Sequence, residues 1–342
     1  MNKRSVQTLT VYSFTHMVVD ALCISGVLSL GLLNNLNEEF IITLIVLYNV
    51  IAFGSQSIIG YFCDIIKRPK LFALLGGSLS ILALAFMKIP ILAMLLFGIG
   101  NGFFHIGGGV RSLYLTPGRA LAPGIFVAPG AIGVFIASYV SDSFLPMMMV
   151  ALILLISLIG IMITKEIEDE EFVKEEPLVT NKFLIVIACL LMVICLRALV
   201  GGALYFPWRT TMTTKIFLLS AIVLGKGLGG VLGDKFGFEV VGVGGLLLSA
   251  LCLYFGESNL MLALIGVFAF NLTMPITLTT LANTFVKYKG FAFGLTTLAL
   301  ASGYMINRSY AYIYERNVVF IVSFILISAT ALYFGLRKKS VL

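Results

Sequence analysis

Two short stretches of the sequence, Gly60-Tyr-Phe-Cys-Asp64 and Gly230-Val-Leu-Gly-Asp234, each place a glycine four residues before an aspartate at the end of an apolar segment. Lys67 and Arg68 follow the first stretch, and Lys235 follows the second. A glycine at this position lets another helix backbone approach closely. The aspartate can accept hydrogen bonds from a neighbouring helix N-terminus or pair with a cation. Because the two stretches fall at matching points of the chain, they indicate an internal duplication.

The rest of the chain is strongly apolar. Of its 342 residues, 60% are hydrophobic and 11% are charged, and the mean hydropathy is +1.07. Soluble domains carry about 25% charged residues, so most of the surface of this protein is expected to face lipid. The cysteines form no CxxC pair and are interpreted as small core residues rather than as disulfides or metal ligands. They are Cys23, Cys63, Cys189, Cys195 and Cys252.

Apolar runs of about 20 residues, the length that crosses roughly 30 Å of hydrocarbon, divide the chain into about twelve predicted membrane spans. The first six are expected near residues 8–33, 39–63, 71–88, 90–114, 120–140 and 144–164. The second six are expected near residues 183–206, 213–234, 238–255, 259–282, 289–312 and 317–336. Lysines and arginines gather in alternate loops, so the positive-inside rule places both termini in the cytoplasm, in agreement with an even number of spans.

These spans predict an all-α integral membrane protein built from two six-helix bundles. The N-terminal bundle is expected at residues 1–164 and the C-terminal bundle at residues 182–342. Between them, residues 165–181 form the longest hydrophilic stretch, with seven acidic residues between Glu166 and Glu176. This stretch is interpreted as a solvated cytoplasmic linker between the two bundles.

The repeated Gly-xxx-Asp stretch with its basic residues resembles the best-known signature of the major facilitator superfamily, which follows helices 2 and 8 of those transporters. The resemblance covers the whole chain at the level of topology. It implies the major facilitator fold, in which two six-helix bundles rock around a central cavity. It also implies a conformational latch on the cytoplasmic side that does not bind substrate. The latch residues would be Gly60, Asp64, Lys67, Arg68, Gly230, Asp234 and Lys235.

Three further segments resemble the fosmidomycin-resistance branch of drug exporters within that superfamily. The first is His16-Met-Val-Val-Asp20 in the first span, and the second is Gly98-Ile-Gly-Asn101-Gly-Phe-Phe-His105 in the fourth. The third, in the seventh span, comprises Arg197, Gly201, Gly202 and Phe206-Pro207. This narrower resemblance implies efflux of a drug-like solute.

The fifth predicted span contains Gly124, Pro129 and Gly133. These residues resemble a partial form of the Gly-xxx-Gly-Pro-xx-Gly-Gly element of antiporters in the same superfamily, with Ala128 and Ile132 in place of two of its glycines. The resemblance implies antiport. The alternative explanation is a helix made thin for close packing against its neighbours.

Three titratable residues are predicted to lie deep in the membrane. His16 and Asp20 are four residues apart and share one face of the first span, while His105 lies near the middle of the fourth. A charge at the bilayer centre costs at least ~2.5–3.5 kcal/mol on insertion scales, so these residues are functional candidates. We expect them to carry protons, because a carboxylate in a weakly hydrated cavity can bind and release protons near neutral pH. The alternative is a structural ion pair between Asp20 and a nearby cation.

The second half of the chain supplies two deep cations. Arg197 lies about 15 residues, or ~22 Å, from the start of the seventh span, and Lys226 lies eight residues before Asp234. This excess of positive charge favours an anionic or phosphonate-like substrate held by the arginine and the lysine. The alternatives for Lys226 are an ion pair with an acid or a role as the proton carrier. Further substrate-binding groups are predicted at Asn101, Asn271, Asn307 and Tyr304.

Other classes of function find little support in the sequence. It contains no P-loop, HExxH or GxSxG motif, so an enzyme is not expected. It also lacks the pore-loop filters and rings of like charge that are typical of channels. The sequence therefore predicts a monomeric secondary transporter in the cell (inner or plasma) membrane that exchanges a small organic solute for protons, without a cofactor, a resident metal or a nucleic-acid partner. The alternative is a divalent metal or metal-chelate transporter that uses His16, Asp20 and His105.

Overall fold

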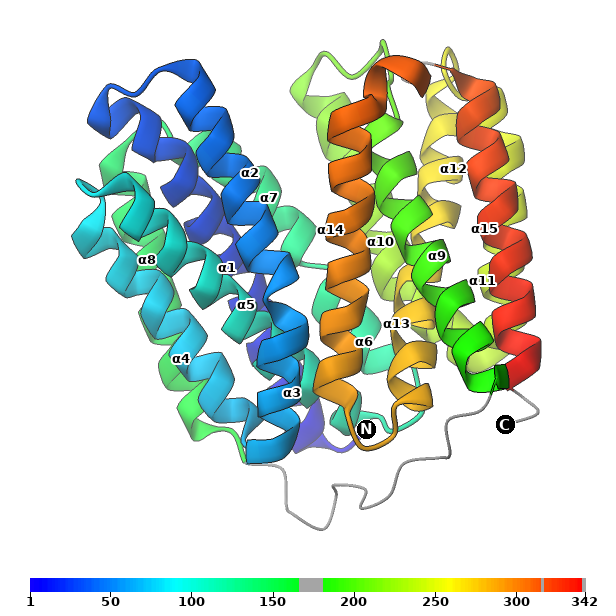
Figure 1. Cartoon of the computed structure of the whole chain (residues 1–342), viewed down its shortest axis with the longest axis horizontal. Helices are drawn as coiled ribbons and strands as arrows, with labels where there is room; N and C mark the ends of the chain where they lie inside the picture. The colour runs from blue at the N-terminus through cyan, green and yellow to red at the C-terminus, as the bar shows by residue number, and fades with distance from the viewer. Residues whose placement is uncertain (166–180, 315–316, 340–342) are drawn as a thin grey trace. The chain divides into compact units, whose positions relative to one another are not determined.

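The computed structural model describes residues 1–165, 181–314 and 317–339, and within these ranges all regular structure is helical (Figure 1). Apart from its two end residues, the predicted acidic linker at 165–181 lies outside the described residues. The helices before the linker are α1 (Lys3–Asn34), α2 (Glu38–Gly54), α3 (Gln56–Ile66), α4 (Pro69–Leu82), the 3₁₀ helix η1 (Ala83–Phe86), α5 (Pro90–Leu115), α6 (Leu121–Val127), α7 (Gly130–Val140) and α8 (Phe144–Ile163). The helices after it are α9 (Asn181–Ala203), α10 (Met212–Phe236), α11 (Phe238–Tyr254), α12 (Leu260–Asn271), α13 (Thr273–Thr284), α14 (Lys289–Tyr314) and α15 (Val318–Lys339).

Ten helical segments of the described chain are long and apolar enough to cross a membrane. They are Lys3–Asn34, Glu38–Ile66, Pro69–Phe86, Pro90–Leu115, Leu121–Val140, Phe144–Ile163, Asn181–Ala203, Met212–Phe236, Leu260–Thr284 and Val318–Arg337. The two other predicted spans are helical but are not among the ten: the span at 238–255 corresponds to the 17-residue α11, which ends at Tyr254, and residues 289–312 lie in the 26-residue α14. The prediction of an all-helical protein with many apolar spans is therefore confirmed. The number of twelve spans and the cytoplasmic position of the termini stay predictions.

Short polar side chains fix where several of these helices begin. The side chain of Asn2 accepts a hydrogen bond from the backbone N–H of Ser5 at the start of α1, and Asn37 does the same for Phe40 at the start of α2. Thr211 and Asn259 cap α10 and α12 in the same way. Such caps satisfy N–H groups that have no partner within the helix.

Three of the membrane-spanning segments are interrupted. Pro275, in the first turn of α13, has no N–H to donate to the carbonyl of Asn271, and α12 ends at that residue. Pro129 separates α6 from α7 for the same reason. The break between α2 and α3 falls at Ser55, which is preceded by Gly54. Each interruption frees backbone polar groups inside an apolar segment, a feature that membrane proteins tolerate only where protein or water surrounds it.

The chain forms two compact units. Unit 1 comprises Met1–Pro117, Pro129–Lys174 and Lys287–Leu298, and unit 2 comprises Gly118–Ala128, Glu175–Val286 and Ala299–Leu342. In unit 1, α1 packs against α5, α7 and α8; in unit 2, α10 packs against α6 and α12, and α9 packs against α15. Helix α6 thus belongs to unit 2 and the first part of α14 to unit 1, whereas the predicted bundles divide at the linker.

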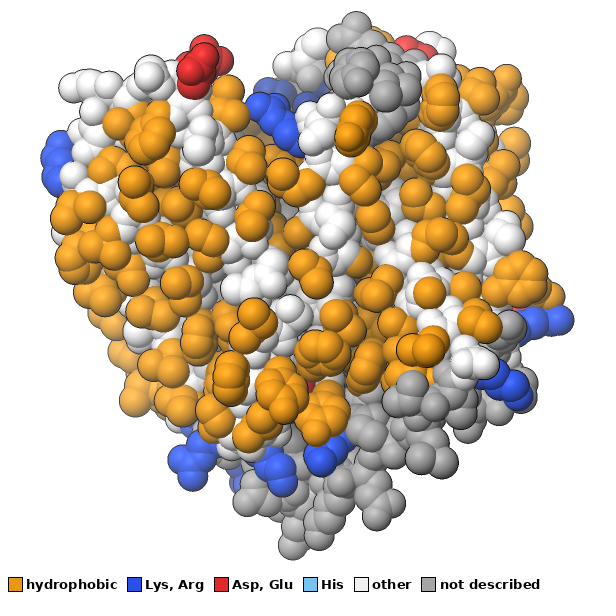
Figure 2. Space-filling view, viewed as in Figure 1, with side chains coloured by type: hydrophobic (Ala, Val, Ile, Leu, Met, Phe, Trp, Pro, Cys, Tyr) orange, Lys and Arg blue, Asp and Glu red, His pale blue; other side chains and the backbone are white. Residues whose placement is uncertain are grey.

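Many large hydrophobic side chains point outward from the helices. On α2 and α3 they include Ile42, Leu47, Val50 and Ile58, and on α8 they include Leu152 and Ile163. Figure 2 shows one face on which hydrophobic side chains predominate, with lysines and arginines near helix ends. An exposed apolar surface of this extent is expected where helices meet lipid.

Candidate functional site

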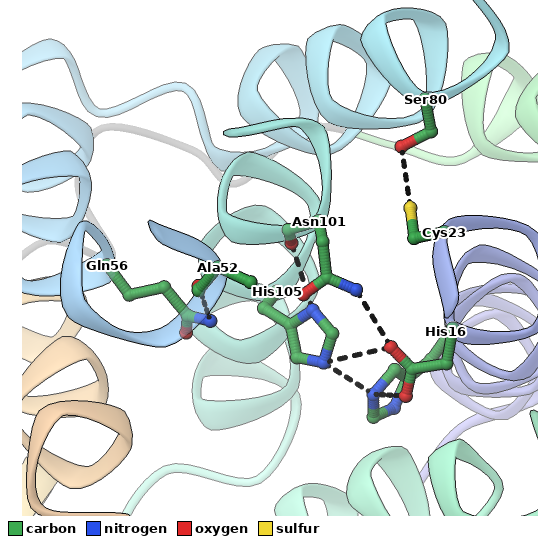
Figure 3. A network of polar contacts seen from close by, with 8 residues as sticks. His16, Cys23, Ala52, Gln56, Ser80, Asn101 and His105 are labelled. Atoms are coloured by element: carbon green, nitrogen blue, oxygen red, sulfur yellow. Dashed lines mark hydrogen bonds and ion pairs between the residues drawn. The ribbon is translucent and has the colours of Figure 1, made fainter. Parts of the chain in front are cut away.

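Three titratable side chains form a buried cluster in unit 1 (Figure 3). His16 Nε2 lies 2.8 Å from His105 Nε2 and 3.3 Å from Asp20 Oδ2, and His105 Nε2 lies 3.6 Å from Asp20 Oδ1. The three residues are only 4%, 7% and 8% exposed for His16, His105 and Asp20 respectively. Helix α1 supplies His16 and Asp20 at adjacent turns, and α5 supplies His105. The structure therefore brings together the residues predicted to couple protons; their role stays a prediction.

Asn101 orients this cluster from one turn earlier on α5. Its side-chain Nδ2 donates a hydrogen bond to Asp20 Oδ1 (2.9 Å), and its backbone carbonyl lies 2.9 Å from His105 Nδ1. A carbonyl can only accept, so His105 Nδ1 carries a proton and, in the neutral ring, His105 Nε2 is the acceptor. The hydrogen bond between the two imidazoles then requires the proton to come from His16 Nε2. One proton held between two rings and next to a carboxylate is an arrangement suited to proton transfer.

Two glycines of α7 allow this helix to pack closely against α1 and the cluster, because a side chain at either position would overlap them. A Cβ on Gly130 would lie 2.7 Å from both Asp20 Oδ2 and His16 Nε2, and a Cβ on Gly133 would overlap the backbone carbonyl of Met17. The sequence indicated Gly133 through the antiporter-like element but did not indicate Gly130. Its only signal was its position directly after Pro129.

The close approach of α7 to α1 leads to a testable prediction for Gly133→Ala. Besides overlapping the Met17 carbonyl, an added methyl group would lie 2.9 Å from the Cβ of Asp20. Overpacking of this kind costs about 1–3 kcal/mol, which exceeds the ~1 kcal/mol that alanine gains over glycine in a helix. We expect a lower Tm in thermal unfolding of the purified protein. Gly54→Ala is the matched control, because nothing lies within 4 Å of its added Cβ. A Tm for Gly133→Ala at or above that of the parent would contradict this packing.

The two predicted latch aspartates bind helix starts in equivalent ways. In unit 1, Asp64 Oδ1 and Oδ2 accept hydrogen bonds from the backbone N–H groups of Gly290 and Phe291, each at 2.8 Å. In unit 2, Asp234 Oδ1 and Oδ2 accept from Ala120 (2.8 Å) and Leu121 (3.0 Å). A carboxylate at a helix N-terminus is favoured by the helix dipole and by unpaired N–H groups.

The glycines of the repeated stretches explain why these helix starts come so close. A Cβ on Gly60 would overlap the carbonyl of Gly290, and a Cβ on Gly230 would overlap the carbonyl of Ala120. The basic residues predicted as part of the latch, Lys67, Arg68 and Lys235, are exposed at the ends of α3 and α10. Lys67 has a left-handed backbone (φ 57°) and terminates α3. Their part in a latch stays a prediction.

In unit 2 the structure brings Arg197 of α9 next to Asn271 of α12. Arg197 Nη2 donates to Asn271 Oδ1 (3.2 Å), and Asn271 Nδ2 donates to the carbonyl of Val267 in its own helix (2.8 Å). Gly225 of α10 lets that helix approach Asn271, since a Cβ there would lie 2.7 Å from the Asn271 Cβ. Lys226 follows on α10 and is half-buried.

Two other predicted substrate residues, and Gly124 of the antiporter-like element, lie elsewhere in unit 2. Asn307 and Tyr304 of α14 are half-buried, and the Asn307 side chain packs against Gly202 of α9. A Cβ on Gly124 of α6 would lie 3.0 Å from the carbonyl of Lys226. Among the described residues, Asn271 is the hydrogen-bond partner of Arg197.

Comparison with known proteins identifies the fold. The chain is similar to the Escherichia coli fucose:proton symporter FucP (TM-score 0.65, 15% identity, covering 99% of each chain). It is similar to the human organic anion transporter MFSD10 (TM-score 0.73, 14% identity, covering 97% of this chain and 100% of that one). It is also similar to a bacterial homologue of the iron transporter ferroportin (TM-score 0.70, 13% identity, covering 99% and 100%).

These matches rest on structure alone, because identities of 13–15% carry no information on substrate. The sequence matches no protein-family model and no curated protein closely enough to assign a family. The narrower resemblance to the fosmidomycin-resistance branch stays a prediction. Over nearly its whole length, the chain shares the fold of these three membrane transporters.

Proposed function

We propose that this protein is a secondary active transporter that moves a small organic solute across the membrane by alternating access and couples this movement to protons. The His16–Asp20–His105 cluster is the observation that carries the proposal. Titratable side chains inside membrane-spanning helices are costly and mark ion or proton pathways. Here three of them meet in one buried cluster. The fold, which the chain shares with the three transporters described above, supports the same function.

Asp20 is the proposed proton-binding group of this transporter. In the unprotonated state its Oδ1 accepts a hydrogen bond from Asn101 and lies 3.6 Å from His105 Nε2, while its Oδ2 lies 3.3 Å from His16 Nε2. A proton that reaches His16 can pass to Asp20 Oδ2 or across the 2.8 Å hydrogen bond to His105. Protonation removes the negative charge of Asp20 and thereby weakens its attraction to the two imidazoles. Carrier states that differ in this attraction therefore differ in the proton affinity of Asp20.

Antiport and efflux are the proposed mode and direction. Gly124, Pro129 and Gly133 support antiport through their resemblance to the antiporter element. The resemblance to drug exporters supports efflux of the solute across the cell (inner or plasma) membrane. Asp64 and Asp234 would hold one end state closed through their bonds to helix starts. A monomer that uses no cofactor is sufficient for this mechanism.

Flux measurements in liposomes test the proposal. We would reconstitute the purified protein with a trapped pH dye and add benzoate, methylphosphonate and a neutral drug in turn. Antiport predicts that the addition of solute outside drives protons out of the vesicle, so that the lumen becomes alkaline. Acidification would indicate symport and correct the mode. Solute flux that is insensitive to an imposed pH gradient would contradict proton coupling.

Transport of a divalent metal is the second candidate function. The ligand atoms that His16, Asp20 and His105 offer all lie within 4.8 Å of one another, which is compact enough for a single ion. In the same liposomes, Zn²⁺ or Fe²⁺ flux that is lost in His105→Gln, without any solute-driven proton movement, would favour this candidate over the first.

A further inference from the structure

The predicted duplication extends from the latch stretches to the charged residues inside the membrane. Asp20 lies in the first predicted span of the first half and is hydrogen-bonded to Asn101 of the fourth. Arg197 lies in the first predicted span of the second half and is hydrogen-bonded to Asn271, again of the fourth. The same pair of helices in each repeat therefore joins a charged residue to an asparagine, but the charge is reversed.

The two asparagines present opposite ends of their amides to these charges. Asn101 directs its Nδ2 donor at the Asp20 carboxylate (2.9 Å). Asn271 uses its Nδ2 on the carbonyl of Val267 and thereby directs its Oδ1 acceptor at the Arg197 guanidinium (3.2 Å). An amide oxygen is neutral, so Asn271 orients the guanidinium and leaves its charge uncompensated.

No described acid neutralises Arg197. Within unit 2, Asp234 is occupied by the backbone of Ala120 and Leu121, Glu239 pairs with Arg337 at 3.7 Å, and Glu257 is exposed and makes no ion pair with Arg197. Of the five N–H donors that a guanidinium carries, the bond to Asn271 uses one. The Nε atom is buried without an acceptor among the described residues. A permanently charged guanidinium in this position is costly unless an anion pairs with it.

We infer that Arg197, positioned by Asn271, is an oxyanion-binding site, and that the ligand is a small organic anion with a carboxylate or phosphonate group. The planar fork of the guanidinium can donate two parallel hydrogen bonds to two oxygens of such a group. This inference rests on the proposed transport function and narrows its substrate class. A permanently cationic solute would be repelled at this site.

Direct binding to the purified protein in lipid nanodiscs tests the inference without transport. The probes are benzoate and methylphosphonate, with benzamide as the neutral match for benzoate. Because two charge-assisted hydrogen bonds are lost, we expect Arg197→Gln to weaken binding of both anions by roughly 30-fold or more and to leave benzamide unchanged. Arg197→Lys keeps the charge but loses the fork and is expected to fall between the two. Arg308→Gln removes an exposed arginine of the same unit and serves as the control.

Thermal unfolding provides a second readout that separates an anion site from a structural role. We expect Arg197→Met to raise the Tm of the ligand-free protein, because it removes an uncompensated, half-buried charge whose Nε atom has no access to solvent. The rise in Tm that benzoate gives the parent protein should disappear in this variant. The inference would be overturned if the ligand-free Tm of Arg197→Met were lower than that of the parent. It would also be overturned if Arg197→Gln bound the anions as the parent does, or if the parent bound no anion. Failure of proton coupling would instead appear only in the liposome flux.

Discussion

Replacing Asp20 by asparagine is expected to abolish solute-driven proton movement while the protein stays folded. The asparagine side chain has the same shape, and its Oδ1 can still accept the hydrogen bond from Asn101 that now ends on Asp20 Oδ1 (2.9 Å). Its amide does not bind a proton near neutral pH, so the group that we propose as the proton carrier is lost. A loss of about 100-fold or more in the coupled rate is expected, the typical contribution of a positioned acid–base group.

The pH-dye liposomes measure this effect, and an unchanged Tm would show that the variant is folded. Asp142→Asn is the matched control, since Asp142 is an exposed carboxylate of the same unit. It should couple as the parent does. If Asp20→Asn transports and couples normally, the proposed mechanism is wrong, and Lys226 or one of the histidines becomes the candidate proton carrier.

Asp64→Ala is expected to release the first turn of α14 from α3. The substitution removes the acceptor of two charge-assisted hydrogen bonds, to Gly290 and Phe291, and leaves both N–H groups unsatisfied. Each such bond contributes about 1.5–3 kcal/mol. A combined loss of roughly 3 kcal/mol would shift the population of the state that they hold by on the order of 100-fold. The transport rate should fall, because the carrier no longer returns readily to that state.

Cys63 offers a native reporter for this release, since it neighbours Asp64 and is 1% exposed. Maleimide labelling, quantified for each cysteine by mass spectrometry, should be much faster at Cys63 in Asp64→Ala than in the parent. Cys23, buried elsewhere in unit 1, should stay protected in both. Glu239→Ala is the control: it removes an acid of unit 2 that lies 3.7 Å from Arg337, and it should leave the labelling of Cys63 unchanged. Unaltered labelling of Cys63 in Asp64→Ala would show that the two hydrogen bonds do not hold a closed state.

The helical fold could be predicted from the sequence because its signals are local. A run of about 20 apolar residues ended by charges predicts a membrane span without knowledge of its neighbours. The interruption at Pro275 has a local cause as well, because proline has no N–H to continue the helix. The break at Ser55 has no such signal: only Gly54 precedes it, and glycine is common within helices of this chain.

The candidate site was only partly predictable, since its contacts join distant parts of the chain. The helical spacing of His16 and Asp20 placed them on one face, but their contact with His105, 89 residues away from His16, required a known packing of spans. The bond from Asp64 to Gly290 joins residues 226 positions apart. Repetition of the Gly-xxx-Asp stretch indicated that each aspartate has a role, without indicating its partner.

The two asparagines of the repeats have a consequence for how such a carrier can evolve. An amide side chain offers a donor at one end and an acceptor at the other, and a half-turn about its last bond exchanges them. An ancestral half with one charged residue beside an asparagine could therefore be duplicated and then changed at that residue alone. The asparagine would adapt by rotation, as the opposite orientations of Asn101 and Asn271 illustrate. A single substitution in a duplicated gene would then be enough to give the two halves of one carrier different ligands.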